Sequence, residues 1–326
     1  MRIRRTSPAL AILALALLAL SAGCDAVGKQ TGPNGDASGE HLLVFATDRP
    51  GTAGGFDVWL YDLDAAGFRA LPNLNGATSE SEPVISDDGQ LIAFARPGGA
   101  GGSDVFVYGR RDEAMADVPN LNSAADETHP RFAHDSRYLA FVRDSAGFKR
   151  IRLYEPVGDS LVSLRNMTAH LPYHDDQPAP DLHGERIAFT SDRDGRNHVY
   201  LWNRTGGIAS APALAGDSLD AEPSLSSNGR WLAFASNRSG GAGGWDVYLY
   251  DVSTAALVRV PRLNTAGEER HPSVSDDGRR ILFQARATAA DDWDLFSWTM
   301  SDSTVRQPAG LSNATANDFQ PNLRWR

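Results

Sequence analysis

The sequence has little cysteine, fewer basic than acidic residues and no familiar catalytic signature. One cysteine in 326 residues excludes an intramolecular disulfide. There is no G-x-S-x-G elbow, no HExxH pair, no P-loop and no dinucleotide-binding fingerprint, so the motifs of several common enzyme classes are missing. The 31 basic residues against 41 acidic ones give a net charge of −10, which argues against nucleic acid and against a polybasic membrane-binding patch.

Long apolar runs are also lacking, except for one at the N-terminus. Arg2, Arg4 and Arg5 precede an apolar run over residues 9–20, which is too short to span a bilayer comfortably. Small residues follow, so residues 1–23 are predicted to be a secretory signal peptide and the protein to be exported. Removing them removes three arginines and no acids, which changes the net charge to −13.

The signal peptide ends in the sequence LSAGC, which resembles the lipobox of bacterial lipoproteins. That resemblance implies cleavage before Cys24, its acylation, and anchoring to a bacterial membrane at the periplasmic face or the cell surface. The alternative is an ordinary cleaved signal followed by a stray cysteine. Residues 24–40 are polar and rich in glycine, without periodicity, which predicts a lipidated cysteine followed by a flexible tether. The lipid is then the only expected contact with the membrane.

Five segments of the remaining sequence, residues 41–326, align without gaps. Each begins with a proline and has a phenylalanine eleven residues later. The prolines are Pro83, Pro130, Pro178, Pro223 and Pro272, and a sixth, Pro321, begins the last six residues of the chain. A repeat of this length, with Asp-Gly or Asn-Gly turns and alternating strand patterns, indicates a four-stranded antiparallel blade of a β-propeller.

The two ends of the chain predict the blade count. Residues 41–49 match the second strand of the repeat, with Phe45 at the phenylalanine position, whereas residues 321–326 match an inner strand alone. Together they complete one blade. The sequence therefore predicts an all-β, six-bladed propeller whose first blade is closed by the C-terminal strand, leaving no exposed sheet edge.

Segments such as PSLSSNGRWLAFASNR and IAFTSDRDGRNHVYLWN resemble the WD40-like repeats of TolB-type propellers. The resemblance covers residues 41–326 and implies binding of protein partners at the mouth of the propeller. TolB carries an additional α/β domain before its propeller, which is not expected here, and this difference puts a role in the Tol–Pal system in doubt. The propeller is expected to be monomeric.

An acidic residue stands three positions before each proline. Such carboxylates can accept backbone N–H groups of their own loop or bridge to an Arg or Ser of the neighbouring blade, which is a structural role. Six converging carboxylates would instead suit a basic partner or a hard cation such as Ca²⁺, the one cofactor considered. These positions are Glu80, Glu127, Asp175, Asp220, Glu269 and Asp318.

The residue directly before each proline varies with a two-fold pattern. Because units three apart face each other in a ring of six, the pattern places like residues opposite one another. Varied side chains at a channel mouth suit recognition. The two histidines could act as metal ligands or as acid–base groups, but packing against the channel wall or a loop is the favoured explanation for them. The residues are Glu82, His129, Gln177, Glu222, His271 and Gln320.

Three functions are consistent with these features. The first is a tethered, non-catalytic module that binds an envelope protein or peptide at the channel mouth. The second is a metal-dependent enzyme or sensor that acts on a saccharide or other small molecule there. The third is a passive structural surface protein. The fold alone does not choose among them.

Overall fold

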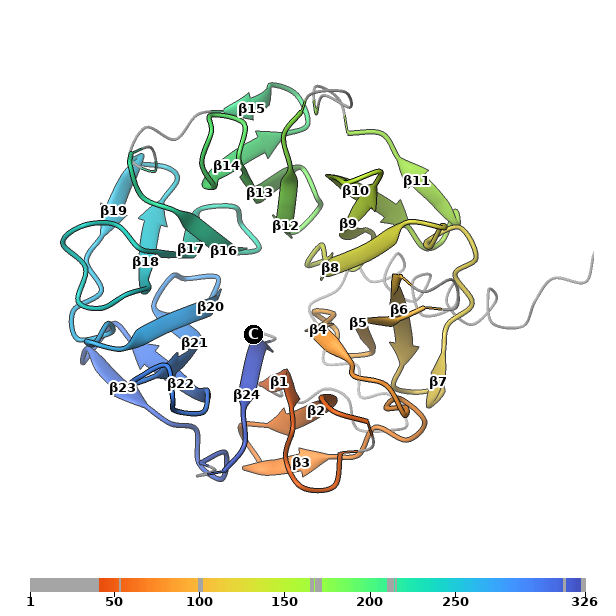
Figure 1. The fold of residues 1–326 in the computed structure, drawn as a ribbon, viewed down its shortest axis with the longest axis horizontal. Coiled ribbons are helices and arrows are strands. Elements are labelled where there is room, and N and C mark those ends of the chain that lie inside the picture. The colour runs from red at the N-terminus through yellow and green to blue at the C-terminus, as the bar shows by residue number, and fades with distance from the viewer. Residues whose placement is uncertain are drawn as a thin grey trace, which may run out of the picture.

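The computed structural model describes residues 41–52, 54–98, 102–164, 167, 172–209, 214, 216–312 and 315–323. The predicted signal peptide, Cys24 and the tether lie outside these residues. Within them, the strands form six four-stranded antiparallel sheets, which are arranged as the blades of a closed ring around a central channel (Figure 1). No helix among the described residues is long and apolar enough to cross a membrane. The predicted fold class is confirmed.

We number the blades along the chain. Blade 1 consists of β24 (Asp318–Leu323), β1 (Leu42–Thr47), β2 (Asp57–Asp62) and β3 (Gly67–Arg69). Blade 2 consists of β4 (Ser81–Ile85), β5 (Leu91–Pro97), β6 (Ser103–Gly109) and β7 (Ala114–Met115). Blade 3 consists of β8 (Asp126–Phe132), β9 (Leu139–Ser145), β10 (Phe148–Glu155) and β11 (Ser160–Val162).

The remaining blades repeat the order from the channel outwards. Blade 4 consists of β12 (Asp175–Pro180), β13 (Arg186–Ser191), β14 (His198–Asn203) and β15 (Gly207–Ala209). Blade 5 consists of β16 (Asp220–Leu225), β17 (Trp231–Ser236), β18 (Asp246–Asp251) and β19 (Ala256–Val258). Blade 6 consists of β20 (Glu268–Val274), β21 (Arg280–Arg286), β22 (Asp294–Thr299) and β23 (Thr304–Arg306).

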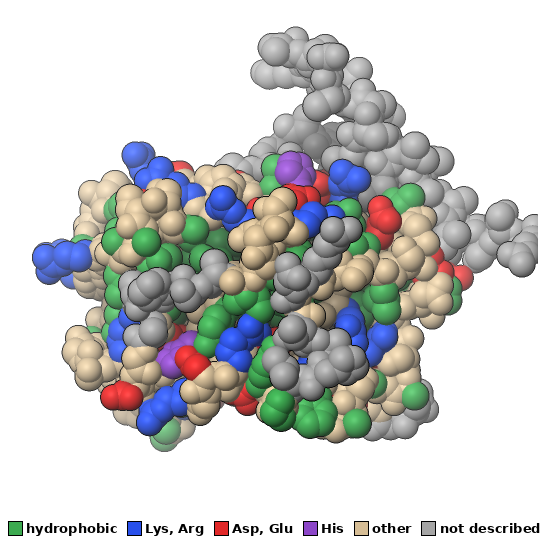
Figure 2. Space-filling view, turned by 90° about the horizontal axis from the view of Figure 1, so that it is seen from above, with side chains coloured by type: hydrophobic (Ala, Val, Ile, Leu, Met, Phe, Trp, Pro, Cys, Tyr) green, Lys and Arg blue, Asp and Glu red, His purple; other side chains and the backbone are tan. Residues whose placement is uncertain are grey.

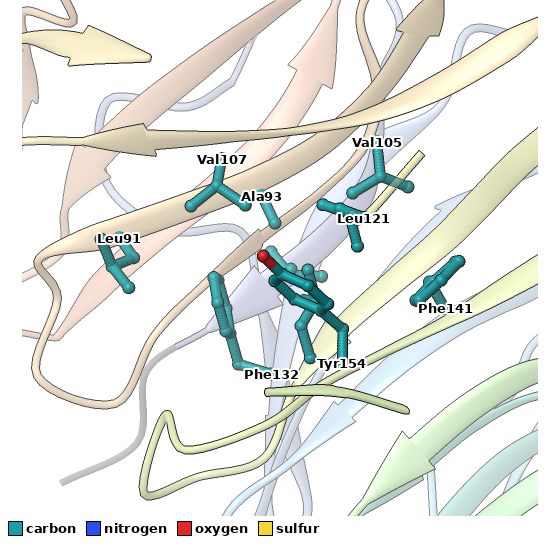
Figure 3. Packing of buried hydrophobic residues seen from close by; sticks show 10 residues of the cluster. Leu91, Ala93, Val105, Val107, Leu121, Phe132, Phe141 and Tyr154 are labelled. Carbon is teal, nitrogen blue, oxygen red and sulfur yellow. The ribbon is translucent and has the colours of Figure 1, made fainter. Parts of the chain in front are cut away.

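The core lies between blades rather than inside them. One hydrophobic cluster fills each junction of neighbouring blades. At the junction of blades 2 and 3, Val105 and Val107 of β6 face Phe132 of β8, Phe141 of β9 and Tyr154 of β10 (Figure 3). The phenylalanine of every repeat is at most 1% exposed, which explains why its position recurs.

The ring closes through β24. This strand pairs with β1 in blade 1, and Leu323 packs with Leu43 and Phe45 of the same blade and with Leu282 and Leu295 of blade 6. The first and last described strands are therefore neighbours in one sheet, as the repeat analysis predicted. Around the rim, acidic, basic and apolar side chains are interspersed (Figure 2).

The inner strands differ from the sequence prediction in one respect. They were expected to begin at the proline, but β4 begins two residues before Pro83 and β8 four residues before Pro130. Each inner strand has a register shift at the residue before the proline, as between Ser81 and Val84. The reason is that proline has no N–H to donate, so the ladder continues past it as a bulge.

Candidate functional site

The residue before each inner-strand proline adopts a left-handed backbone conformation. All six have φ between 47° and 57°, although none is glycine. This conformation is strained for residues with a side chain, and such strain gathers at functional sites. We call these six residues the mouth ring; they are Glu82, His129, Gln177, Glu222, His271 and Gln320.

Side chains of the mouth ring hold the backbone of the next blade. Gln320 Oε1 accepts the N–H of Glu82 at 2.8 Å, and Glu82 Oε2 accepts the N–H of His129 at 2.6 Å. On the other side of the ring, Gln177 Oε1 accepts the N–H of Glu222 at 2.9 Å, and Glu222 Oε2 accepts the N–H of His271 at 2.8 Å. The ring thus consists of two triplets of the order Gln, Glu, His.

Each histidine also contacts the carboxylate of its own triplet. His129 Nε2 lies 3.0 Å from Glu82 Oε1, and His271 Nε2 lies 3.1 Å from Glu222 Oε1. The histidines accept no N–H of the next blade. Asp176 Oδ1 receives the N–H of Gln177 at 2.8 Å, and Gln284 Oε1 receives the N–H of Gln320 at 2.7 Å. The histidine side chains are therefore not needed for the backbone bonds of the ring.

The six mouth-ring side chains line one small cavity together with Arg131, which follows Pro130. The space open to a water-sized sphere is about 20 Å³, enough for one water molecule. Arg131 also lines a second cavity of about 60 Å³ deeper in the channel. Burial lowers the pKa of Arg131, and the charges of Glu82 and Glu222 oppose that shift. At the mouth ring the open space in the channel is therefore about the size of one water molecule.

The pKa values of the two histidines shift in opposite directions despite their matching contacts with the ring glutamates. Burial lowers the pKa of His271 to about 4, because the charge of Glu222 only partly compensates and Arg270 lies close. Burial also disfavours the charged form of His129, but Glu82 and Asp176 outweigh it and raise the pKa of His129. Asp176 Oδ1 lies 3.0 Å from His129 Nδ1, and Lys149 bonds the other oxygen of Asp176 at 2.6 Å.

The acids three residues before the prolines occupy separate sites inside the blades. All six are at most 1% exposed. In five blades an arginine of the same blade, rather than of the neighbouring blade as expected, pairs with the acid. The pairs are Arg49 with Asp318, Arg96 with Glu80 (3.8 Å), Arg143 with Glu127 (2.6 Å), Arg193 with Asp175 (2.6 Å) and Arg238 with Asp220 (2.9 Å).

Glutamates among these acids also accept N–H groups of their own loops. Glu80 receives the N–H of Gly76 at 3.2 Å, and Glu127 that of Ser123 at 3.2 Å. Such bonds agree with the structural interpretation of the acidic positions. Within the described part of the chain, no three His, Cys, Asp or Glu residues are grouped so that they could hold a metal ion. The mouth ring is therefore the better candidate for recognition.

Sequence reasoning missed two contributions. The first is Arg131, which lines the mouth-ring cavity. Its signal in the sequence was a lone arginine after the proline, where the other repeats have small, apolar or amide side chains. The second is Asp176, which replaces the missing acceptor after His129. An acid next to Asp175 is visible in the sequence, but its role depends on contacts across blades.

Comparison of the sequence with family models and with curated proteins gives no match. Solved structures do match the fold. TolB from Acinetobacter baumannii has a TM-score of 0.69 at 16% identity, over 88% of this chain and 67% of that one. A putative TolB from Agrobacterium tumefaciens has a TM-score of 0.59 at 15% identity, over 87% of this chain and 99% of that one.

A third matching structure differs from this protein in how its ring is closed. The β-propeller domain of the Trilobed protease from Pyrococcus furiosus has a TM-score of 0.53 at 14% identity, over 84% of this chain and 95% of that one, and is described as having an open velcro topology. Here β24 pairs with β1 and closes the ring. The described part of the chain therefore has the fold of a closed, TolB-like six-bladed propeller.

Proposed function

We propose that this chain is a non-catalytic binding module of the cell envelope, which recognises a protein or peptide at its mouth ring. The observation that carries the proposal is the set of six non-glycine residues in left-handed conformation at one end of the channel. Glycine would relieve the strain at each position. Side chains of three types occur there instead, and they meet at one place.

The chemistry of the ring favours a polar partner. Its histidines are partly exposed, with 25% of the His129 side chain and 20% of the His271 side chain reaching solvent. Because the cavity below is about the size of one water, the partner would lie on the ring with its own donors and acceptors rather than enter the channel. The fold shared with TolB structures, and the habit of that family of binding proteins at this mouth, support the same surface.

A double substitution of the ring histidines tests this surface. His129→Ala with His271→Ala leaves the backbone acceptors Gln320, Glu82, Gln177 and Glu222 in place, so the fold should persist. Purified full-length chain, crosslinked in envelope extracts, should capture a discrete partner that the double variant captures at least about tenfold less, because it lacks the two imidazole hydrogen-bonding groups of the ring.

The control is His183→Ala. This exposed histidine lies in the turn between β12 and β13, at the opposite end of the inner strands, where it pairs with Asp135 at 2.7 Å. The control should capture the partner like the wild type. Equal capture by the double variant, at an unchanged melting temperature, would refute binding at the mouth ring.

We further propose that the module is exported and lipid-anchored through Cys24. The apolar run followed by LSAGC at residues 20–24 supports this. Two or three acyl chains anchor a protein stably, whereas a single chain does not. Cys24→Ala should move the protein from the membrane fraction to the soluble fraction after cell lysis. Continued sedimentation of the variant with membranes would contradict the anchor.

A further inference from the structure

Five blades share a buried slot that an arginine of the same blade fills. The guanidinium pairs with the acid three residues before the proline and stacks over the repeat phenylalanine. In blade 5, Arg238 lies 5.1 Å above the ring of Phe234 and 4.7 Å above that of Tyr248, and bonds Asp220. In blade 2, Arg96 lies 4.0 Å above Phe106. The slot is thus a carboxylate beside an aromatic floor.

Blade 6 has the slot but not the arginine. In the other blades the arginine follows the repeat phenylalanine by two or four residues, as in Phe94 to Arg96 and Phe234 to Arg238. In blade 6 it follows Phe283 by three, at Arg286. The ladder of blade 6 places Ala285 opposite Glu269 and Arg286 opposite Glu268, whereas that of blade 3 places Arg143 opposite Glu127. The odd spacing therefore directs Arg286 to Glu268 at the edge of the cavity and not to Glu269.

The contacts of Arg286 agree with this displacement. Its guanidinium pairs with Glu268 at 2.8 Å and lies 4.4 Å over the ring of Trp293. The two even positions hold Ala285 and Ala287 instead, and both line a cavity. Two small side chains therefore stand where five blades have an arginine.

The cavity in blade 6 retains the other parts of the slot. Its volume is about 660 Å³, and Glu269, Phe283 and Phe296 line it. The two phenylalanine rings stack with their centres 6.1 Å apart, as the rings of Phe94 and Phe106 do at 5.9 Å. Asp291, Asp292 and Asp294 add negative charge at the lining, against the single positive charge of Arg286.

Glu269 has a buried carboxylate, of which only one oxygen accepts a hydrogen bond among the described residues. It is 0% exposed, and its Oε1 accepts the hydroxyl of Thr265 at 2.6 Å. Its Oε2 is buried and has no hydrogen-bond partner among the described residues. Glu80 Oε2 and Asp220 Oδ2 are likewise buried without a hydrogen-bond partner, although their slots hold an arginine. What distinguishes Glu269 is therefore the missing cation, which leaves its buried carboxylate without an arginine beside it.

We propose that this cavity, the blade 6 slot, binds the guanidinium group of an arginine side chain supplied by a peptide or protein partner. The Glu269 carboxylate forms the ion pair with the guanidinium, and Phe283 with Phe296 form the floor on which it stacks. In the other five blades an arginine of the chain itself pairs with the acid and lies over the repeat phenylalanine. The site lies apart from the mouth ring and does not depend on the function proposed for it.

Guanidinium fits this slot better than an ammonium group. A planar guanidinium stacks on an aromatic face while donating in its own plane to a carboxylate, whereas an ammonium is a compact, strongly hydrated charge. Burial raises the pKa of Glu269, and repulsion from Asp246 and Glu268 adds to that shift. A bound cation favours the ionised carboxylate, so affinity for the guanidinium should rise with pH.

A titration with blocked single amino acids tests the slot directly. N-acetyl-arginine-N-methylamide, added to the full-length chain up to millimolar concentrations, should shift the NMR signals of Thr265, Ala285 and Ala287. Blocked citrulline, which has nearly the same shape without the charge, and blocked lysine should bind at least roughly tenfold more weakly. No shift at these alanines with the arginine probe would overturn the proposal.

Two variants and one control localise the binding. Glu269→Gln should weaken arginine binding by about tenfold or more, because the charged acceptor is gone. Ala285→Arg restores the spacing of Phe94 to Arg96, so it should fill the slot, abolish binding and leave the protein folded. Glu127→Gln changes the matching acid of a filled slot and should leave binding unchanged. Undiminished binding by folded Ala285→Arg would refute the assignment, as would equal losses in Glu269→Gln and Glu127→Gln.

Discussion

The mouth ring consists of two halves that match in residue order and differ in how they shift the pKa of their histidines. In both triplets a glutamine holds the N–H of a glutamate, and the glutamate holds the N–H and the ring of a histidine. Yet the pKa of His129 is raised, whereas that of His271 is lowered to about 4. Identical hydrogen bonds therefore do not fix the charge of the site.

A charged residue next to each triplet accounts for the difference in histidine pKa. His129 has Asp176 on its other side, so two carboxylates stabilise its charged form. His271 shares Glu222 with Arg270, whose Nη2 lies 2.6 Å from the same carboxylate oxygen that His271 contacts. The two halves of the mouth thus shift the pKa of their histidines in opposite directions.

Removing the C-terminal strand β24 disrupts the triplet that contains Gln320 and leaves the other triplet complete. Of the changes considered, we expect it to lower the stability of the protein most. A chain ending at Asn317 loses Gln320 from the first triplet, the buried pair of Asp318 with Arg49, and Leu323 from the junction of blades 6 and 1. We expect the melting temperature to fall by roughly 10 °C or more, followed by circular dichroism, because several kcal/mol of packing are lost.

Gln320→Ala is the matched control for the truncation. It removes the acceptor for the N–H of Glu82 and leaves β24 in place, so it should cost only about 1 kcal/mol. A truncated chain that melts within a few degrees of the wild type would contradict closure by β24.

The next largest effect on stability should be a difference between substitutions of the two ring glutamates, Glu222 and Glu82. Glu222 is 5% exposed and faces both Arg270 and His271, whereas Glu82 is 16% exposed. Glu→Gln keeps an acceptor for the backbone N–H but removes the charge. We expect Glu222→Gln to lower the free energy of unfolding by about 2–3 kcal/mol and Glu82→Gln by less than about 1 kcal/mol in urea at neutral pH. Equal losses would show that Arg270 does not distinguish the halves.

The fold could be predicted from the sequence because every blade packs against its neighbours through the same positions of the repeat. The Pro-to-Phe spacing recurs since the phenylalanine fills the junction between blades, and the split first blade followed from Phe45 and Pro321 standing in incomplete units. The start of the inner strands was not readable. Proline suggests a strand boundary, but here the ladder bulges around it and continues.

The site was readable only in part. Positions of the mouth ring follow from the repeat, but their left-handed backbone leaves little sequence signal, because four of the six are Glu or Gln, which seldom adopt it. The pKa shifts of His129 and His271 depend on Asp176 and Arg270, which directly precede ring residues in the sequence, but the contacts that these two side chains make depend on how the blades pack. The missing arginine of blade 6 is visible in the sequence as the spacing of three residues between Phe283 and Arg286. That spacing can be interpreted only when the structure shows the arginines of the other blades paired with their acids.

The smallest expected effect is a divergence in pH dependence between the two histidines. The pKa of His271 falls from 6.5 to about 4 on folding, so the unfolded chain binds the proton first and stability declines as pH drops from 6.5 towards 4. His271→Gln should remove this decline. The raised pKa of His129 contributes stability that is fully present below pH 6.5 and lost as pH rises through the folded value, so His129→Gln should remove a loss on the alkaline side. Urea unfolding at about pH 5 and about pH 8 should show the two variants changing the pH slope in opposite directions, by about 2 kcal/mol for His271→Gln. Slopes that change in the same direction would contradict opposite pKa shifts at the two histidines.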